Sequence, residues 1–469
     1  MMRNDIISEL PESLITQILL WLPTKDSIKT SVLSTRWRNL WLNVPGLDLN
    51  SDDFRFPYRD IIKNFTERFL EFNSMSGLQK FKMKNDYGKY NVCSERLKEW
   101  IATAVDSGIQ HLDFETKNPL LLKDLMPMNI YKSKTLVSLK LVCVELENPK
   151  FVVSLPCLKI LHLEKIWYCY DGPLVVEKLI SGCPVLEDLT MVRIHDADIQ
   201  ALPLLHVRSL TLKIFRLMFN LEMTTRPILV EIDAPKLKYL SFKARQSDKI
   251  MVKNLSSLFK IDLDTDFGGS SLEPHDLRKR RDIIRDVLTG ISSVRHMIIS
   301  QRTLEVIHGY SKLGPIPKFH HLTHLKAAFS STSLQLLLAF LESCPNLKNL
   351  ILDLSVSTEP ERIDITNVPR CITTTLECIE INKLIRKGET GIKLVQYFLE
   401  NSPILKKAKL SFTDSPMSMT NLPLDRVFKM YLTSRKRSRR CQVIISYHAS
   451  DVSEGMNIVI EQRCRRLFL

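Results

Sequence analysis

Glycine is scarce in this sequence, at only 14 of 469 residues. Because glycine lets a backbone approach phosphate closely, its scarcity argues against nucleotide-binding loops, and it also argues against long flexible linkers. The motifs G-x-x-x-x-G-K-S/T, G-x-G-x-x-G and G-x-S-x-G are missing. The sequence therefore predicts a continuously packed chain, and no motif supports an enzyme.

The sequence also lacks the marks of a secreted or membrane protein. None of its ten cysteines belongs to a C-x-x-C pair, and several lie in apolar stretches, as Cys143 does. We expect buried, reduced thiols and a reducing compartment. The start, MMRNDIISELPESL, has acids and a proline where a secretory signal is cationic and then apolar, and no run approaches about 20 apolar residues. These features predict no membrane contact and a location in the nucleus, the cytoplasm or both.

Positive charge is concentrated rather than spread through the chain. The net charge is +14, and twelve of those charges come from Arg278 to Arg281, from Arg435 to Arg440 and from Arg463, Arg465 and Arg466. Such clusters can act as nuclear-import signals or contact phosphates, or they can be solvated loops at an edge of the fold. No aromatic residues interleave with them, which disfavours a platform for stacking single-stranded nucleic acid.

The first fifty residues predict three short helices. Pro11 suits a first helical position, and Leu14, Ile18 and Leu22 recur at i, i+4 and i+8 before Pro23 ends the helix. Thr24 is a candidate N-cap for a second helix with Ile28 and Val32 on one face, and Ser34 for a third, on which Trp37, Leu40 and Trp41 share a side. A unit this small cannot bury so much apolar surface by itself, so we expect the rest of the chain or a partner to cover it.

This segment, LPESLITQILLWLPTKDSIKTSVLSTRWRNLW, resembles an F-box of the plant type. The resemblance covers about residues 5 to 45 and rests on two Leu-Pro steps and the RWR-x-LW tail at fixed spacing. It implies binding to the Skp adaptor of a Skp–cullin–F-box ubiquitin ligase. Carried over by position, it implies that the adaptor surface is formed or supported by Leu10, Pro11, Leu14, Ile18, Leu22, Pro23, Ile28, Val32 and Trp37.

From about residue 80 one pattern, L-x-x-L-x-L, keeps returning. It begins at Leu136, Leu158, Leu186, Leu237 and Leu347, with a looser copy at Val207-x-x-Leu210-x-Leu212. Between their middle positions, from 139 to 240, the steps are 22, 28, 21 and 30 residues, close to the range of about 20–29 for leucine-rich repeats. One copy cannot cover its apolar face whereas stacked copies can, so the pattern predicts an α/β solenoid; around residues 265–320 its register is lost.

Helical stretches precede three Cys/Ser-Pro steps of this body. Leu174–Ile180, Leu334–Leu341 and Ile392–Leu399 have apolar residues three and four apart, and Pro184, Pro345 and Pro403 follow them. Farther on, Val368-Pro369-x-Cys371, Leu376-Glu377-x-Ile379, the run Leu399 to Lys407, and Cys441-Gln442-Val443 resemble the FBD domain of plant F-box proteins. Members usually have a tryptophan or a similar aromatic residue soon after the Leu-Glu step, whereas the segment here reads EINKLIRKGET. The resemblance implies a closing cap for the solenoid.

Two short motifs suggest chemistry without supporting it. His320-His321-x-x-His324 lacks the glutamate of H-E-x-x-H and has no cysteine pair nearby. Leu322 and Leu325 beside it indicate a repeat strand instead. Asp266-Phe267-Gly268 resembles a kinase element, but the glycine-rich and H-R-D loops are absent from the sequence. We expect no metal, no cofactor and no catalytic residue in this chain.

The sequence therefore predicts an α/β protein: a short all-helical F-box, a leucine-rich-repeat-like solenoid and an FBD-like C-terminal cap. The expected parts are residues 1–50 (F-box), 51–79 (connecting segment), 80–365 (solenoid), 366–447 (FBD-like) and 448–469 (basic tail). We expect a non-catalytic substrate receptor that binds the Skp adaptor, through it a cullin, and a protein substrate on the repeats. The alternatives are a basic nucleic-acid-associated repeat protein and a small-ligand receptor on the same scaffold. The substrate and the residues that bind it are not predicted.

Overall fold

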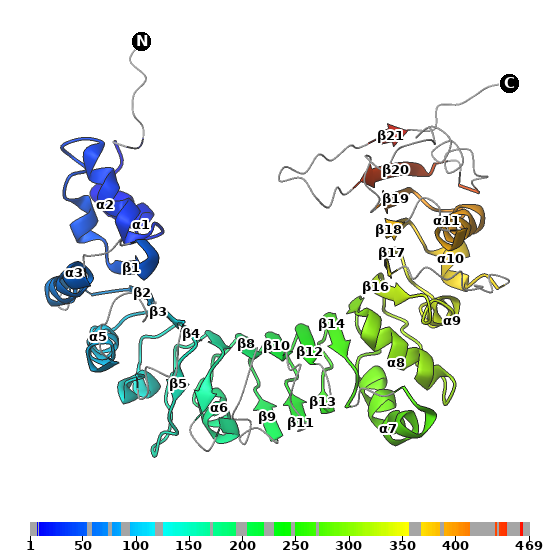
Figure 1. Cartoon of the computed structure of the whole chain (residues 1–469), viewed down its shortest axis with the longest axis horizontal. Helices are drawn as coiled ribbons and strands as arrows, with labels where there is room; N and C mark the ends of the chain where they lie inside the picture. Colours follow the sequence, from blue (N-terminus) through cyan, green and yellow to red (C-terminus); the bar gives the residue numbers. More distant parts are fainter. Residues whose placement is uncertain are drawn as a thin grey trace, which may run out of the picture. The chain divides into compact units, whose positions relative to one another are not determined.

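A computed structural model describes most of the chain (Figure 1). The described residues are 7, 9–53, 59–73, 77–85, 94–117, 125–168, 172–193, 204–219, 229–244, 249–268, 272–355, 367–384, 389–412, 437–438, 440–447 and 460–462. The chain divides into two compact units, one of Met1–Leu221 with Asp233–Lys236 and one of Glu222–Ile232 with Leu237–Leu469. Within the described ranges, no helix is both long enough and apolar enough to cross a bilayer.

The first unit begins with short helical pieces around a small apolar core. The helical elements are α1 (Glu12–Leu19), α2 (Thr24–Lys29), and the 3-10 turns η1 (Thr30–Val32) and η2 (Leu40–Asn43). Pro11 and Pro23 are the N-caps of α1 and α2, each one residue before the helix begins. Both prolines have an extended backbone at this position. Because proline has no backbone N–H, no hydrogen-bond donor is left unpaired there.

The remainder of the first unit is a parallel sheet with helices and short strands between its members. The sheet strands are β1 (Gly46–Asn50), β2 (Lys80–Asn85), β3 (His111–Thr116), β4 (Ser138–Val142), β6 (Ile160–Glu164), β8 (Asp188–Arg193) and β10 (Ile214–Phe219). The intervening elements are η3 (Ser51–Asp53), α3 (Arg59–Asn73), α5 (Ser94–Asp106), η5 (Met128–Lys132), β5 (Glu145–Leu146), β7 (Trp167–Tyr168), α6 (Gly172–Ser181) and β9 (Leu204–Arg208).

Every sheet strand of this unit enters the ladder in the same register. One row of aligned, buried residues crosses it from strand to strand: Leu47, Phe81, Leu112, Leu139, Leu161, Leu189 and Phe215. Because side chains alternate along a strand, each strand points this row inward and its neighbours outward. Stacked repeats therefore bury a continuous apolar column that no single repeat could bury.

The second unit repeats the same plan. Its sheet strands are β12 (Tyr239–Ala244), β14 (Lys260–Thr265), β15 (His296–Ile299), β16 (His324–Ser330), β17 (Asn349–Ser355), β18 (Cys378–Leu384), β19 (Lys407–Phe412), β20 (Gln442–Tyr447) and β21 (Ile460–Gln462). The others are β11 (Leu229–Asp233), β13 (Lys249–Asn254), α7 (Pro274–Gly290), α8 (Gln301–Ser311), α9 (Leu336–Glu342), α10 (Arg370–Thr374) and α11 (Glu389–Asn401). Helices α9, α10 and α11 lie on one side of strands β16 to β19 (Figure 1).

The FBD-like residues extend the ladder of the second unit rather than forming a separate core. Ile379, Ala408 and Val443 of β18, β19 and β20 align with Leu350 of β17, and all four are buried. The last strand, β21, pairs antiparallel with β20. An antiparallel strand on the final parallel strand covers an edge that would otherwise offer unpaired N–H and C=O groups to another chain.

The predicted repeat strands are confirmed where the L-x-x-L-x-L pattern is regular. The copies that begin at Leu136, Leu158, Leu186, Leu237 and Leu347 fall on β4, β6, β8, β12 and β17, with their pattern residues buried. The looser copy was wrong, because Leu210 is 75% exposed. The repeat there is Leu212-x-x-Phe215-x-Leu217 on β10, whose three apolar residues are buried.

Residues 265–320, where the register was lost, contain regular structure. Helices α7 and α8 flank strand β15, and β16 follows at His324. The long helix α7 lengthens the interval between repeat strands, which hides the repeat from a search by spacing. The helices expected before Pro184, Pro345 and Pro403 are present as α6, α9 and α11.

The described cysteines fit the expectation of buried thiols in most cases. Of the seven that the described residues include, all are free; five are buried, Cys378 is half-buried and Cys157 is exposed. Burial raises the pKa of Cys183 and Cys371 to about 12 and that of Cys344 well above its usual value. These thiols are therefore protonated and inert at neutral pH. Cys93, Cys169 and Cys464 lie outside the described residues.

Candidate adaptor-binding surface

Helix α1 has one apolar face turned inward and another turned to solvent. Ile15 and Leu19 are buried in a cluster with Trp37, Leu40 and Val44. Leu14 and Ile18, one residue earlier on the neighbouring row, are each 46% exposed. A single helix that is apolar on both faces needs two partners, and among the residues that the structure describes only the inner one is present.

The structure divides the predicted adaptor residues into three groups. Pro11, Leu14, Ile18, Leu22, Pro23 and Val32 are exposed; Leu10 and Ile28 are half-buried; Trp37 is buried. The first group has the access that a binding surface needs. Trp37 can only support such a surface from beneath, because its indole is 5% exposed. Their role in adaptor binding remains a prediction.

Sequence reasoning missed three apolar residues of the same segment. Trp21 is 85% exposed, Leu33 65% and Ile7 56%. Trp21 follows Leu14 by seven residues and Ile18 by three, which continues the outward row of α1. That spacing was the signal for Trp21, since large aromatic residues dominate the energetics of interfaces.

Two details predicted for this segment were wrong. Thr24 does not cap α2: it is the first helical residue, is buried, and accepts a hydrogen bond from the backbone N–H of Asp48 at 2.8 Å. The third helix from Ser34 is a series of turns followed by the short η2. The segment bends because Trp37 and Leu40 both turn into the core, while Trp41 stays half-buried outside it.

The helical segment is bound tightly to the first strands of the sheet. Lys80 of β2 donates to a carboxylate oxygen of Asp48 at 2.9 Å and to the carbonyl oxygen of Leu20 at 3.4 Å. Gly46 lies so close to Leu20 that an added β-carbon would be 2.3 Å from its Cδ1. Together with the bond to Thr24, these contacts hold the helices against β1 and β2.

The open face of the first sheet carries paired charges between neighbouring strands. Lys84 binds Glu115 at 2.8 Å, and Arg216 binds Asp188 at 2.8 Å. Lys140 lies 3.4 Å from Asp113. Pairs this exposed contribute only about 0–1 kcal/mol each, so they shape the surface more than they stabilise it.

On the open face of the second unit, His296 of β15 and His324 of β16 stack at 4.0 Å between ring centroids and 7° between planes. Asn349 of β17 lies 2.9 Å from the Nε2 atom of His324. Burial lowers the pKa of His296, as do His324, Lys260 and Arg295; burial and Lys348 lower the pKa of His324.

This histidine pair predicts a pH-dependent stability. Because the folded pKa values lie below the ordinary 6.5, the unfolded chain binds more protons as pH falls through that value, and the free energy of unfolding decreases. We expect the melting temperature to fall between pH 7.5 and pH 5.5, by less in a His296→Gln variant, as measured by scanning calorimetry at both pH values. An equal fall in the variant would contradict a contribution from this pair.

The two motifs that resembled chemistry lie beside repeat strands, before β16 and after β14. His320 and His321 are exposed and His324 begins β16; in the described residues no group of histidine, cysteine and acidic side chains is arranged to hold a metal ion. Asp266 and Phe267 are buried, and the left-handed Phe267 (φ 55°) ends the segment after β14. Arg280 of the basic cluster lies on α7, is 5% exposed and donates to the carbonyl oxygen of Asp266 at 2.5 Å. Arg280 is therefore unavailable to phosphate, whereas Arg278 and Arg281 are exposed. The cluster lies on a helix and not in the loop that was one of its expected placements.

Three families match successive parts of the chain. Residues 7–48 match the F-box domain, residues 97–258 match the LRR repeats of FBD-associated F-box protein At5g56370, and residues 364–410 match FBD. The putative F-box/FBD/LRR-repeat protein At5g44950 of Arabidopsis thaliana is 59% identical over 450 residues, which cover 95% of this chain and 100% of that protein. The chain belongs to the F-box/FBD/LRR-repeat family.

Other members of the F-box/FBD/LRR-repeat family match over similar lengths. Arabidopsis thaliana F-box/FBD/LRR-repeat protein At2g26030 is 57% identical over 95% of this chain and 100% of its own length. FBD-associated F-box protein At5g27750 of the same plant is 48% identical over 94% of this chain and 98% of its own length. An F-box joined to leucine-rich repeats indicates a substrate-adaptor role, and F-box domains generally bind Skp adaptors.

Proposed function

We propose that this F-box/FBD/LRR-repeat protein is a substrate-recognition subunit of a Skp–cullin–F-box ubiquitin ligase. The exposed residues Leu14 and Ile18 of α1 and Trp21 of the turn after it, together with Val32 and Leu33, would dock on the Skp adaptor and through it on a cullin. The repeats would hold a protein substrate. The chain itself would act by positioning, since it raises the effective concentration of substrate lysines near the conjugating enzyme.

One observation carries this proposal: α1 exposes Leu14 and Ile18 while its opposite row fills the small helical core. A helical unit this small does not stably expose so many large apolar side chains unless a partner covers them. The charged pairs on the open face of the first sheet offer no comparable apolar patch. The adaptor therefore fits the helical segment better than it fits the repeats.

The test is a pull-down of full-length protein by purified Skp adaptor. We expect Leu14→Asp with Ile18→Asp to weaken binding at least about 100-fold, because each change buries an unpaired carboxylate in the contact. Leu210→Asp is the matched control, since Leu210 is also exposed and apolar but lies beyond the helical segment. Circular dichroism should be unchanged in both variants.

Two results would contradict the proposal. Wild-type protein that folds but does not bind the adaptor would leave the helical segment as a cap of the repeats. Equal binding by the aspartate variant and the wild type would move the contact away from α1. In the first case, salt-dependent binding to RNA or DNA becomes the measurement of choice, because phosphate contacts weaken steeply with salt.

A further inference from the structure

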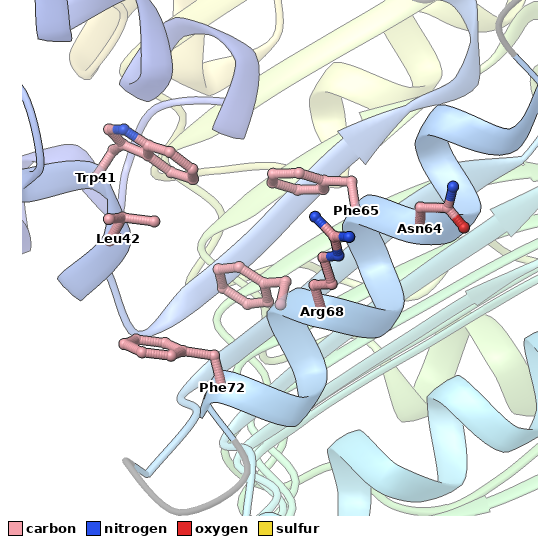
Figure 2. Close-up of a pocket in the computed structure, with 7 residues that line it drawn as sticks. Trp41, Leu42, Asn64, Phe65, Arg68 and Phe72 are labelled. Carbon is pink, nitrogen blue, oxygen red and sulfur yellow. The ribbon is translucent and has the colours of Figure 1, made fainter.

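An aromatic pocket lies beside the helical segment, between η2 and α3 (Figure 2). Its volume is about 500 Å³. That is within the range of about 300–1,000 Å³ found for small-molecule sites. It is lined by Trp41, Leu42, Asn64, Phe65, Arg68, Phe69 and Phe72. The pocket has no part in the adaptor surface proposed above, which is formed by other residues.

The spacing of aromatic residues on α3 creates one wall of this pocket. Phe65, Phe69 and Phe72 recur at i, i+4 and i+7 and therefore share a side of the helix. Ile62 and Leu70 are buried, which fixes the helix in place. Phe72 is 63% exposed at the open end. Phe69 is itself 7% exposed, so the packing of α3 presents a row that runs from buried Phe69 to exposed Phe72.

Trp41 of η2 continues this wall across the gap. Its ring lies 6.2 Å from that of Phe65 with 23° between planes, and Phe65 lies 6.1 Å from Phe69 with 26° between planes. Figure 2 shows Trp41 and Leu42 facing α3 from the neighbouring segment. Near-parallel rings at these separations present flat apolar faces on which another apolar body can stack.

The lining contains a single charged side chain. Arg68 lies one turn from Phe65 on α3, and Figure 2 shows both on the side that faces Trp41. Among the described residues, no carboxylate forms an ion pair with Arg68. Its guanidinium is always charged and has a fork geometry that matches carboxylate and sulfonate oxygens. An anionic group held at this point would supply the missing charge.

We propose that this pocket binds a small amphipathic acid, with its apolar body against Trp41, Phe65 and Phe69 and its anionic group on Arg68. The lining suits no strongly polar ligand such as a nucleotide or a sugar, because Asn64 and Arg68 are the only polar side chains that it offers. Because Arg68 is the one cation of the lining, the ligand should carry one acidic group. The apolar body can be aliphatic or aromatic, and the experiment below separates these two.

The experiment uses full-length protein that carries Leu14→Asp and Ile18→Asp, so that the exposed apolar row of α1 does not bind the probe. Anilinonaphthalene sulfonate, an aromatic sulfonate, is the fluorescent probe. Decanoate and naphthoate are the competing acids, each beside its uncharged alcohol. We expect each competing acid that binds to displace the probe at least about tenfold better than its alcohol, since a charge-assisted bond to Arg68 is worth at least that factor.

Three variants locate the site. Arg68→Gln should remove the advantage of acid over alcohol, and Leu42→Trp, which fills the pocket, should abolish probe binding. Arg38→Gln, an exposed arginine outside the lining, should behave as the unsubstituted background. Naphthoate binding without decanoate binding would identify an aromatic ligand, and the reverse an aliphatic one. Circular dichroism and thermal melting check that each variant is folded.

Several outcomes would overturn the proposal. Acid and alcohol that compete equally would remove the role of Arg68, as would wild-type behaviour of Arg68→Gln. Probe binding retained by Leu42→Trp would place the probe elsewhere. Adaptor pull-down with Arg68→Gln in the otherwise wild-type chain keeps the two proposals separate: loss of adaptor binding there, without competition by any acid, would assign the pocket to the adaptor interface instead.

Discussion

Replacing Trp37 with alanine should destabilise the helical segment by about 3–5 kcal/mol, the usual cost of truncating a buried large aromatic residue. Trp37 is 5% exposed and shares its core with Ile15, Leu19, Leu40 and Val44. Few other residues fill this core, so the cavity cannot be closed by repacking. A loss of this size is a large fraction of the stability of any small unit.

Hydrogen–deuterium exchange measures this effect separately in the segment and in the body. In Trp37→Ala, backbone amides of residues 12–44 should lose protection, while those of β16 to β19 should keep it. Trp21→Ala is the matched control, because it removes the same side chain from a position that is 85% exposed. Unchanged protection in Trp37→Ala, or equal loss in Trp21→Ala, would show that Trp37 does not hold this core together.

Gly182→Ala should destabilise the first unit by about 3 kcal/mol, in the upper part of the range for overpacked sites. An added β-carbon would be 2.6 Å from Cγ1 of Val153 and 2.7 Å from its carbonyl oxygen. A side chain can rotate away, but a backbone oxygen cannot. The backbone of Gly182 is also held in place, since its carbonyl accepts from the N–H of Leu155 at 2.9 Å.

Gly290→Ala offers the comparison for this prediction. Its added β-carbon would lie 3.5 Å from the nearest atom of Val252, an ordinary contact, and Gly290 is the last residue of α7. Alanine is a better helix former than glycine there, so this variant should be neutral or more stable by up to about 1 kcal/mol. The measurement is the melting temperature of each variant relative to that of the wild type. A Gly182→Ala protein as stable as the wild type would contradict the prediction and mean that Val153 moves aside.

Much of the repeat body could be predicted from leucine spacing alone, and its failures have physical causes. The copy at Val207 was misplaced because Leu210 happens to complete the pattern, although it is exposed between β9 and β10. Strand β15 was missed because α7 separates it from β14 by more residues than a typical repeat allows. Spacing reports a repeat only when the connecting segments are of similar length.

The candidate surfaces show a second limit of sequence reasoning. The outward row of α1 follows from helical periodicity, so Leu14 and Ile18 could be predicted, whereas the burial of Trp37 depends on how later turns fold back. The aromatic pocket could not be predicted, because Trp41 and Phe65 come from different elements and meet only through the packing of α3. Thr24 was likewise predicted to be a cap, but its hydroxyl accepts a hydrogen bond from the backbone N–H of Asp48, which lies far from it in the sequence.

The contacts that join the helical segment to β1 and β2 define the smallest piece that evolution or an engineer can exchange. A segment cut at residue 45 would lose Asp48, which bonds Thr24 and Lys80, and the close approach of Gly46 to Leu20. The helical segment and the beginning of the repeats are thus one structural block. An exchange of the helical segment between proteins should therefore be cut after β2, so that Gly46, Asp48 and Lys80 move with it.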